Sequence, residues 1–137
     1  FDFEEDLTHL FFECQSTNRL WNITLKMLQI VTGQQLRYIT QRVVLTGFQK
    51  TGFPNMHLDL AEILRSAYWS TIWQDRNQKL WNNPEVPMKI IYNAKLKDYL
   101  ETQRQIYIRQ DMIPSFDHIF GLNKIFKMYA DRIILLL

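Results

Sequence analysis

Two residues near the start of the chain, His9 and Cys14, are of types that bind metal ions. They lie five positions apart, in the string THLFFEC. A neutral imidazole and a thiolate are both ligands of structural zinc, but such a site needs four ligands. Two ligands bind zinc too weakly, and a lone His or Cys beside apolar residues more often serves packing. From these residues alone we therefore expect packing rather than metal binding at His9 and Cys14, and we expect no cofactor in this chain.

A second group of residues has the chemistry to contact nucleic acid. Its members are the basic residues of one predicted helix, namely Lys89, Lys95, Lys97, Arg104 and Arg109. Lys and Arg neutralise phosphates, and the tyrosines of the same helix offer rings on which bases stack. Acidic residues lie among them and weaken the positive field, so a solvated helix face is the alternative interpretation. Any binding to RNA or DNA is expected to be weak and strongly salt-dependent.

The cluster Trp69, Trp73, Arg76 and Asn77 admits two interpretations. Aromatic rings next to an arginine could stack bases and hold phosphate. Alternatively, a Trp pair at i, i+4 forms part of a core stripe, with the polar residues placed where the helix meets a neighbour. We favour the structural interpretation, because the helix is apolar on several faces and would otherwise expose a large hydrophobic area.

Catalysis finds little support in the sequence. No Gly-x-Ser-x-Gly turn is present to hold a nucleophile, and no glycine-rich loop is present to bind phosphates. Cys14 is numerically able to pair with a histidine, but a cysteine within an apolar helix is usually unreactive. We therefore predict that this chain is not itself an enzyme.

The elements that must position these residues are predicted to be helices. Apolar residues recur at helical spacing from Leu20 to a stop at Gly33, from Asn55 to Asn82, and from Pro87 onward to about residue 109. A last helix is predicted from a cap at Ser115 to about Ile133, interrupted by a glycine. Shorter helices are expected near residue 6 and over residues 37–45. No run alternates clearly with a two-residue period, so we predict an all-α fold of five to seven helices.

Composition favours one globular domain over residues 1–137, with residues 55–109 as its central helices. Hydrophobic residues make up 47% and charged residues 22%, a balance that argues against disorder. The single cysteine excludes an intrachain disulfide, and the longest apolar run, the last five residues, is far too short to cross a bilayer. We accordingly expect an intracellular protein, nuclear or cytoplasmic, with no membrane partner.

The net charge of +2 is too small to indicate a polyanion-binding protein by itself. Its distribution is uneven, however. Residues 1–32 hold two basic and five acidic side chains, a net of −3, whereas residues 33–84 carry +3 and residues 85–137 carry +2. Weak nucleic-acid contact is therefore expected on the later helices.

Two stretches of the chain resemble the region near the C-terminus of non-LTR retrotransposon reverse transcriptases. The string LTHLFFEC, followed by Arg19-Leu20-Trp21, is similar to the second half of the zinc-binding region in that family. Downstream, the string IWQDRN looks like the Ile-Trp-x-x-Arg-Asn helix that follows the zinc region. The two features occur in the order that the family would have them and frame residues 7–82.

The chain departs from the family at the first half of the zinc site. In the family a Cys pair precedes the His-x4-Cys pair, whereas Cys14 is the only cysteine here. Residues 1–32 thus resemble half of a zinc-binding region. Either the chain begins too late to include the pair or the pair has been lost, and zinc is expected only if a Cys pair lies upstream.

The resemblance implies a non-catalytic helical segment of a reverse transcriptase polyprotein. It would brace the polymerase and bind RNA or target DNA weakly through the basic helix. The alternative is a retroelement-derived module that binds a protein partner or a second copy of itself. The apolar end of the chain, Ile133 to Leu137, favours this alternative because five consecutive apolar residues must be buried somewhere.

Overall fold

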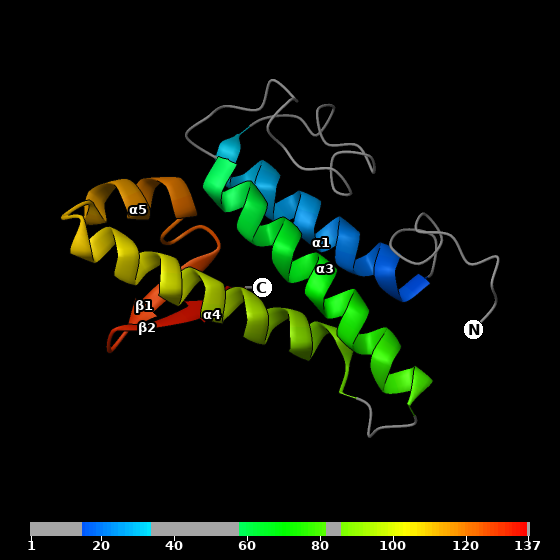
Figure 1. Ribbon diagram of the computed structural model, residues 1–137. Helices are drawn as coiled ribbons and strands as arrows, with labels where there is room; N and C mark the ends of the chain where they lie inside the picture. Colours follow the sequence, from blue (N-terminus) through cyan, green and yellow to red (C-terminus); the bar gives the residue numbers. More distant parts are fainter. Residues whose placement is uncertain (1–14, 34–57, 82–85, 137) are drawn as a thin grey trace.

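The computed structural model describes residues 15–33, 58–81 and 86–136 (Figure 1). These residues form α1 (Gln15–Thr32), α3 (Leu58–Leu80), α4 (Met88–Arg109), α5 (Ile113–Phe120), β1 (Phe126–Tyr129) and β2 (Arg132–Leu135). The described part of the chain is thus mostly helical, as predicted, but it has four helices rather than five to seven. The helices expected near residue 6 and over 37–45 lie outside the described residues. No helix in the described segments is long and apolar enough to cross a membrane.

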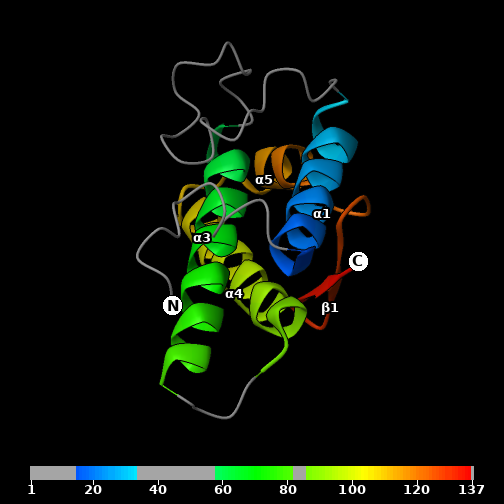
Figure 2. The same ribbon diagram turned by 90° about the vertical axis from the view of Figure 1, so that its right-hand side faces the viewer.

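The helices pack as a central pair with smaller elements around it. α1 lies alongside α3, and α4 packs extensively against α3 (Figures 1 and 2). α5 folds back over the C-terminal end of α4, while the two strands lie against another side of α4. α3 and α4 thus form the central pair of the described residues.

Helix boundaries follow local sequence signals. α1 ends where Gly33 takes a positive φ of 67° and donates its N–H to the Gln29 carbonyl at 2.9 Å. α4 begins directly after Pro87, whose carbonyl accepts from the Ile91 N–H at 3.2 Å.

The cap predicted at Ser115 is wrong. Met112 occupies the N-cap, and a proline fits into the first turn of α5, where no backbone donor is needed.

Aromatic side chains fill the end of the core near α5. Phe116 and Phe120 stack with ring centroids 4.6 Å apart, and Tyr107 of α4 meets each of them edge-on at 5.6 Å. Other large side chains that are fully buried come from α1, α3, α4 and β1, namely Met27, Leu28, Leu60, Leu64, Tyr68, Tyr92 and Phe126. One continuous hydrophobic core therefore joins the helices and the hairpin.

Two buried tyrosines attach α1 to the central pair. The Tyr92 hydroxyl of α4 and the Thr24 hydroxyl of α1 are hydrogen-bonded at 2.7 Å. Tyr68 of α3 donates to the Thr17 carbonyl at 3.4 Å and packs edge-on against Trp21, with centroids 5.5 Å apart. Each buried hydroxyl thus has a partner, as burial requires.

The chain after α5 corrects the sequence prediction. A helix was expected up to Ile133, but the structure has an antiparallel hairpin in which Phe126 pairs with Leu135 and Tyr129 with Arg132. The helix cannot continue because Gly121 adopts a left-handed conformation, with φ of 78°. Within β1 and β2 the more buried and more exposed positions alternate, which is the two-residue period of a strand.

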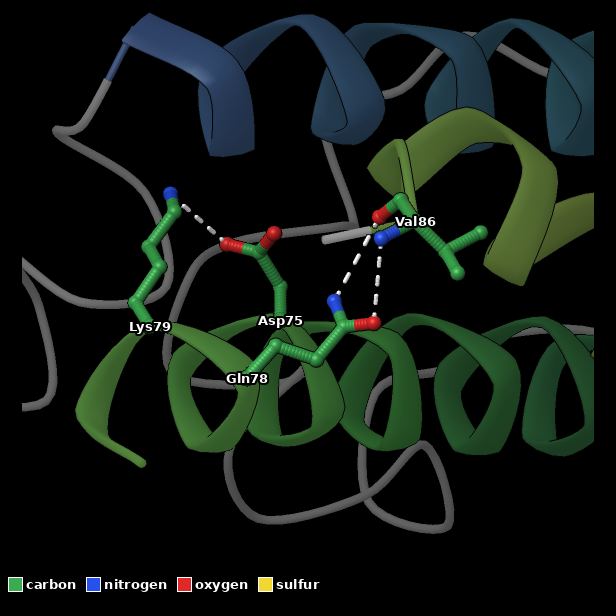
Figure 3. A network of polar contacts seen from close by, with 4 residues as sticks. All are labelled: Asp75, Gln78, Lys79 and Val86. Atoms are coloured by element: carbon green, nitrogen blue, oxygen red, sulfur yellow. Dashed lines mark hydrogen bonds and ion pairs between the residues drawn. The ribbon is translucent and has the colours of Figure 1, made fainter. Parts of the chain in front are cut away.

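A glutamine joins the end of α3 to the approach to α4 (Figure 3). Gln78 is buried, and its side-chain oxygen accepts from the Val86 N–H at 3.1 Å while its amide donates to the Val86 carbonyl at 3.4 Å. The next residue, Lys79, pairs at 3.0 Å with Asp75, which lies one turn earlier on α3. The paired amide contacts set the spacing between α3 and the start of α4.

Candidate nucleic-acid interface

The basic residues predicted on one helix do not share one surface. A helix advances about 100° per residue, so Lys97 and Arg104 project within about 20° of each other. They line one groove, between α4 and the hairpin. Lys95 projects about 160–180° away from them, and Arg109 about 120–140° away. The predicted set is therefore divided between different faces of α4.

Lys89, the first of the predicted residues, lies in a different place again. It is exposed near the beginning of α4 and lines a smaller pocket. This pocket also contains Lys26 of α1 and Lys124, which precedes β1. Lys89 thus lines a pocket with two lysines that are not among the predicted nucleic-acid-binding residues.

The groove between α4 and the hairpin brings together cations from two elements. Its volume is about 630 Å³, and Lys97 and Arg104 are joined there by Arg132 of β2. The sequence does not place Arg132 in this group, because the apolar spacing there predicts a helix rather than a strand. The sequence from Asp131 onward reads DRIILLL, which does not alternate between polar and apolar residues, so no local signal could have revealed it.

Carboxylates balance the charge of this groove. Asp98 and Glu101 of α4 and Asp131 of the hairpin turn are among its described lining residues. Glu101 also has a structural role, because its Oε1 accepts from the Ile133 N–H at 3.3 Å and so fastens β2 to α4. Three cations and three carboxylates give this set of side chains no net charge, so the groove lacks the strong positive field of a dedicated polyanion site.

Arg104 has the most distinctive environment among the groove cations. Its side chain is half-buried, and its Nε is buried with no hydrogen-bond partner among the described residues. A guanidinium presents several N–H donors in a planar fork that matches phosphate and carboxylate oxygens. Arg104 therefore lines the groove with a guanidinium whose Nε donor has no partner among the described residues.

The tryptophan cluster lies on α3, at the edge of the core rather than within it. Trp69 is partly buried against the core, whereas Trp73 is 39% exposed. Arg65 lies over the Trp69 ring at 5.8 Å from its centroid, and Arg76 lies over the Trp73 ring at 5.5 Å. In both cation–π contacts the arginine and the tryptophan belong to α3, so each guanidinium lies over a ring of its own helix. The favoured interpretation, a buried Trp pair, thus fits Trp69 better than Trp73; Asn77 is exposed.

The buried tyrosines do not supply acid–base chemistry near neutral pH. Burial raises the pKa of Tyr68 and the pKa of Tyr92 well above the usual tyrosine range. Burial also raises the pKa of Tyr107, whose hydroxyl donates to the Asp59 carboxylate at 3.2 Å. All three phenols are therefore neutral structural groups at physiological pH.

The predicted zinc ligands His9 and Cys14 lie outside the described residues. Within the described segments, no group of three or more His, Cys, Asp or Glu side chains is arranged to hold a metal ion. The expectation of an empty half-site stays a prediction.

Comparisons with protein-family models, curated proteins and solved structures found no match to this chain. The retrotransposon relationship therefore rests on the resemblance of the two sequence stretches alone.

Proposed function

We propose that this chain is a non-catalytic helical segment of a reverse transcriptase polyprotein, as the sequence resemblance implies, and that it binds RNA or DNA weakly. The observation that supports nucleic-acid binding best is the meeting of Lys97, Arg104 and Arg132 in one groove. Phosphate contacts supply most of the affinity of such surfaces, and the neighbouring carboxylates lower it. The groove accordingly fits an auxiliary contact rather than a high-affinity site.

A pair of charge-matched double variants tests this proposal. Lys97→Gln/Arg132→Gln removes two cations from the groove, and Lys95→Gln/Arg109→Gln removes two from other faces of α4. Binding of a fluorescent single-stranded RNA is measured by anisotropy across a salt series. We expect the groove variant to bind roughly fivefold more weakly, with a salt slope lower by about 1–2, and the control variant to bind nearly as the wild type does.

Equal losses in the two variants would contradict the groove, because affinity would then follow net charge alone. RNA binding that does not weaken between low and high salt would contradict a phosphate-dominated contact. Arg104→Lys serves as a third variant, since it keeps the charge but removes the guanidinium fork.

The alternative proposal is a protein-interaction or homodimerisation module. The apolar end of the chain supports it less than the sequence suggests, because part of that run is buried against the core: Ile133 is fully buried and Leu135 is half-buried. A different feature now supports it. Trp81 is 70% exposed at the end of α3, and Ile90 is 58% exposed at the start of α4. A dimeric mass by light scattering, without RNA affinity, would favour this alternative over the groove.

A further inference from the structure

A second pocket lies where α1, the start of α4 and the chain on either side of the hairpin meet. Its volume is about 320 Å³, at the lower end of the range for small-molecule sites. α1 contributes one wall through Ile23, Met27 and Ile30, and Ile125 and Leu136 contribute another. The Leu136 N–H donates to the Ile125 carbonyl at 2.9 Å, so backbone pairing holds these two residues together.

Three lysines from three separate elements line this pocket, and we refer to it as the lysine-rimmed pocket. Lys26 comes from α1, Lys89 from α4 and Lys124 from the turn before β1, and all three are exposed. No Asp or Glu is among the described lining residues. Like charges gathered without a carboxylate repel one another, and a bound anion would relieve this repulsion. The α4–hairpin groove differs, because its cations are balanced by carboxylates.

Behind the lysines the lining is largely apolar. Leu20, Met27 and Ile125 are buried in the core, and Ile23 packs against it. These packed side chains give the pocket an apolar inner wall. The Tyr92 hydroxyl is already engaged with Thr24, and Asn93 adds one amide to the wall. The lining therefore combines a cationic rim, one amide and an apolar interior.

The size of the pocket limits what it could hold. At roughly 30 Å³ for each water-sized group, 320 Å³ accommodates on the order of ten non-hydrogen atoms. A bare inorganic anion would leave the apolar lining uncovered, whereas a neutral apolar molecule would leave the lysines without a counter-charge. A ligand with an anionic head and a short apolar body satisfies both parts.

We propose that the lysine-rimmed pocket binds a small amphipathic anion, a carboxylate or phosphate group attached to a short alkyl or aryl body. The head contacts Lys26, Lys89 and Lys124, and the body lies against Met27 and Ile125. This function does not depend on the nucleic-acid proposal, because Lys89 is the sole residue that the pocket shares with the predicted basic set.

Nuclear magnetic resonance titration of the full chain with four probes tests this proposal. The probes are octanoate, octyl phosphate, inorganic phosphate and octanol, which separate the head from the body. We expect octanoate or octyl phosphate to bind with a dissociation constant on the order of 1 mM, at least tenfold more tightly than inorganic phosphate or octanol. Amide shifts should concentrate at Lys26, Lys89 and Lys124. The tighter of the two amphipathic probes identifies the head group.

Matched variants locate the site on the molecule. Lys26→Gln and Lys89→Gln should each weaken binding of the better probe by roughly threefold to fivefold, and Ile30→Gln should weaken it by removing apolar surface. Lys97→Gln and Lys127→Gln, which change the same charge outside the pocket, should alter it by less than about twofold.

Several results would overturn the inference. One such result is octanoate and octyl phosphate binding no more tightly than octanol, and another is equal binding by all five variants. Shifts confined to the α4–hairpin groove would also contradict it. All the substituted side chains are wholly or partly exposed, and circular dichroism checks that each variant keeps its helices.

Discussion

Gly121 is the residue whose type the fold restricts most clearly. It ends α5 with φ of 78°, a conformation that costs other residues about 1–2 kcal/mol. A Cβ at this position would lie 2.8 Å from Val31 Cγ2 of α1 and 3.3 Å from Ile125 Cγ1. The glycine therefore serves both the helix stop and the close approach of α1 to the end of α5.

Replacement of Gly121 by alanine is expected to destabilise the fold by about 2–4 kcal/mol. The left-handed backbone accounts for part of this loss, and displacement of the branched Val31 side chain accounts for the rest. Urea denaturation followed by circular dichroism measures the change.

Gly33 provides the control for this substitution. Its φ is 67°, but a Cβ there would meet nothing within 4 Å. Gly33→Ala should therefore cost about 1 kcal/mol, the backbone contribution alone. If both variants lost the same stability, the steric role assigned to Gly121 against α1 would be wrong.

At the scale of the element, the hairpin turn contains a residue, Ala130, that does not favour its conformation. Ala130 and Asp131 both have positive φ, 48° and 61°, between paired Tyr129 and Arg132. These signs belong to a two-residue type I′ turn, for which Asn-Gly is the preferred sequence. The turn is therefore held by the packing of Phe126 and the rest of the hairpin against the core.

The double substitution Ala130→Asn/Asp131→Gly should raise the melting temperature. Both new residues adopt positive φ at lower cost, which we expect to stabilise the hairpin by roughly 1 kcal/mol. Calorimetry measures the shift. Ala130→Val should act in the opposite direction, because a branched side chain is disfavoured at positive φ, and stabilisation by this control would refute the turn geometry.

The same turn explains why the hairpin could not be predicted. The sequence has no Asn-Gly or Asp-Gly signal at this point, and the apolar spacing from Ile119 to Ile133 predicts a helix. Gly33, Pro87 and the long apolar stripes of α3 and α4, by contrast, were sufficient to predict those helices. Local signals were strong at the helix ends and absent at the hairpin.

The candidate site was predictable only in part, for the same reason. The seven-residue spacing of Lys97 and Arg104 places them on one face of a helix from sequence alone. Arg132 joins them only because β2 returns against α4. The lysine-rimmed pocket draws on three segments far apart in the chain, and no local pattern reports such a meeting.

At the scale of the whole molecule, buried tyrosines connect α1 to both central helices. Tyr92 reaches Thr24 at 2.7 Å, and Tyr68 reaches the Thr17 carbonyl at 3.4 Å. Burial raises the pKa of each phenol above the value it has in the unfolded chain. Between these two pKa values the unfolded chain releases a proton that the folded chain keeps, so stability falls as pH rises.

We therefore expect the free energy of unfolding to be insensitive to these phenols below about pH 9 and to decline above about pH 10. Each tyrosine contributes a loss on the order of 1 kcal/mol per pH unit in that range. Urea denaturation at pH 8, 10 and 11 measures the slope. Tyr68→Phe/Tyr92→Phe removes both ionisations, so its stability, although lower at pH 8, should decline less steeply above pH 10 than that of the wild type. Identical slopes in the two proteins would mean that these hydroxyls are not protected from ionisation in the folded state, and that the attachment of α1 to the central pair is looser than the buried contacts imply.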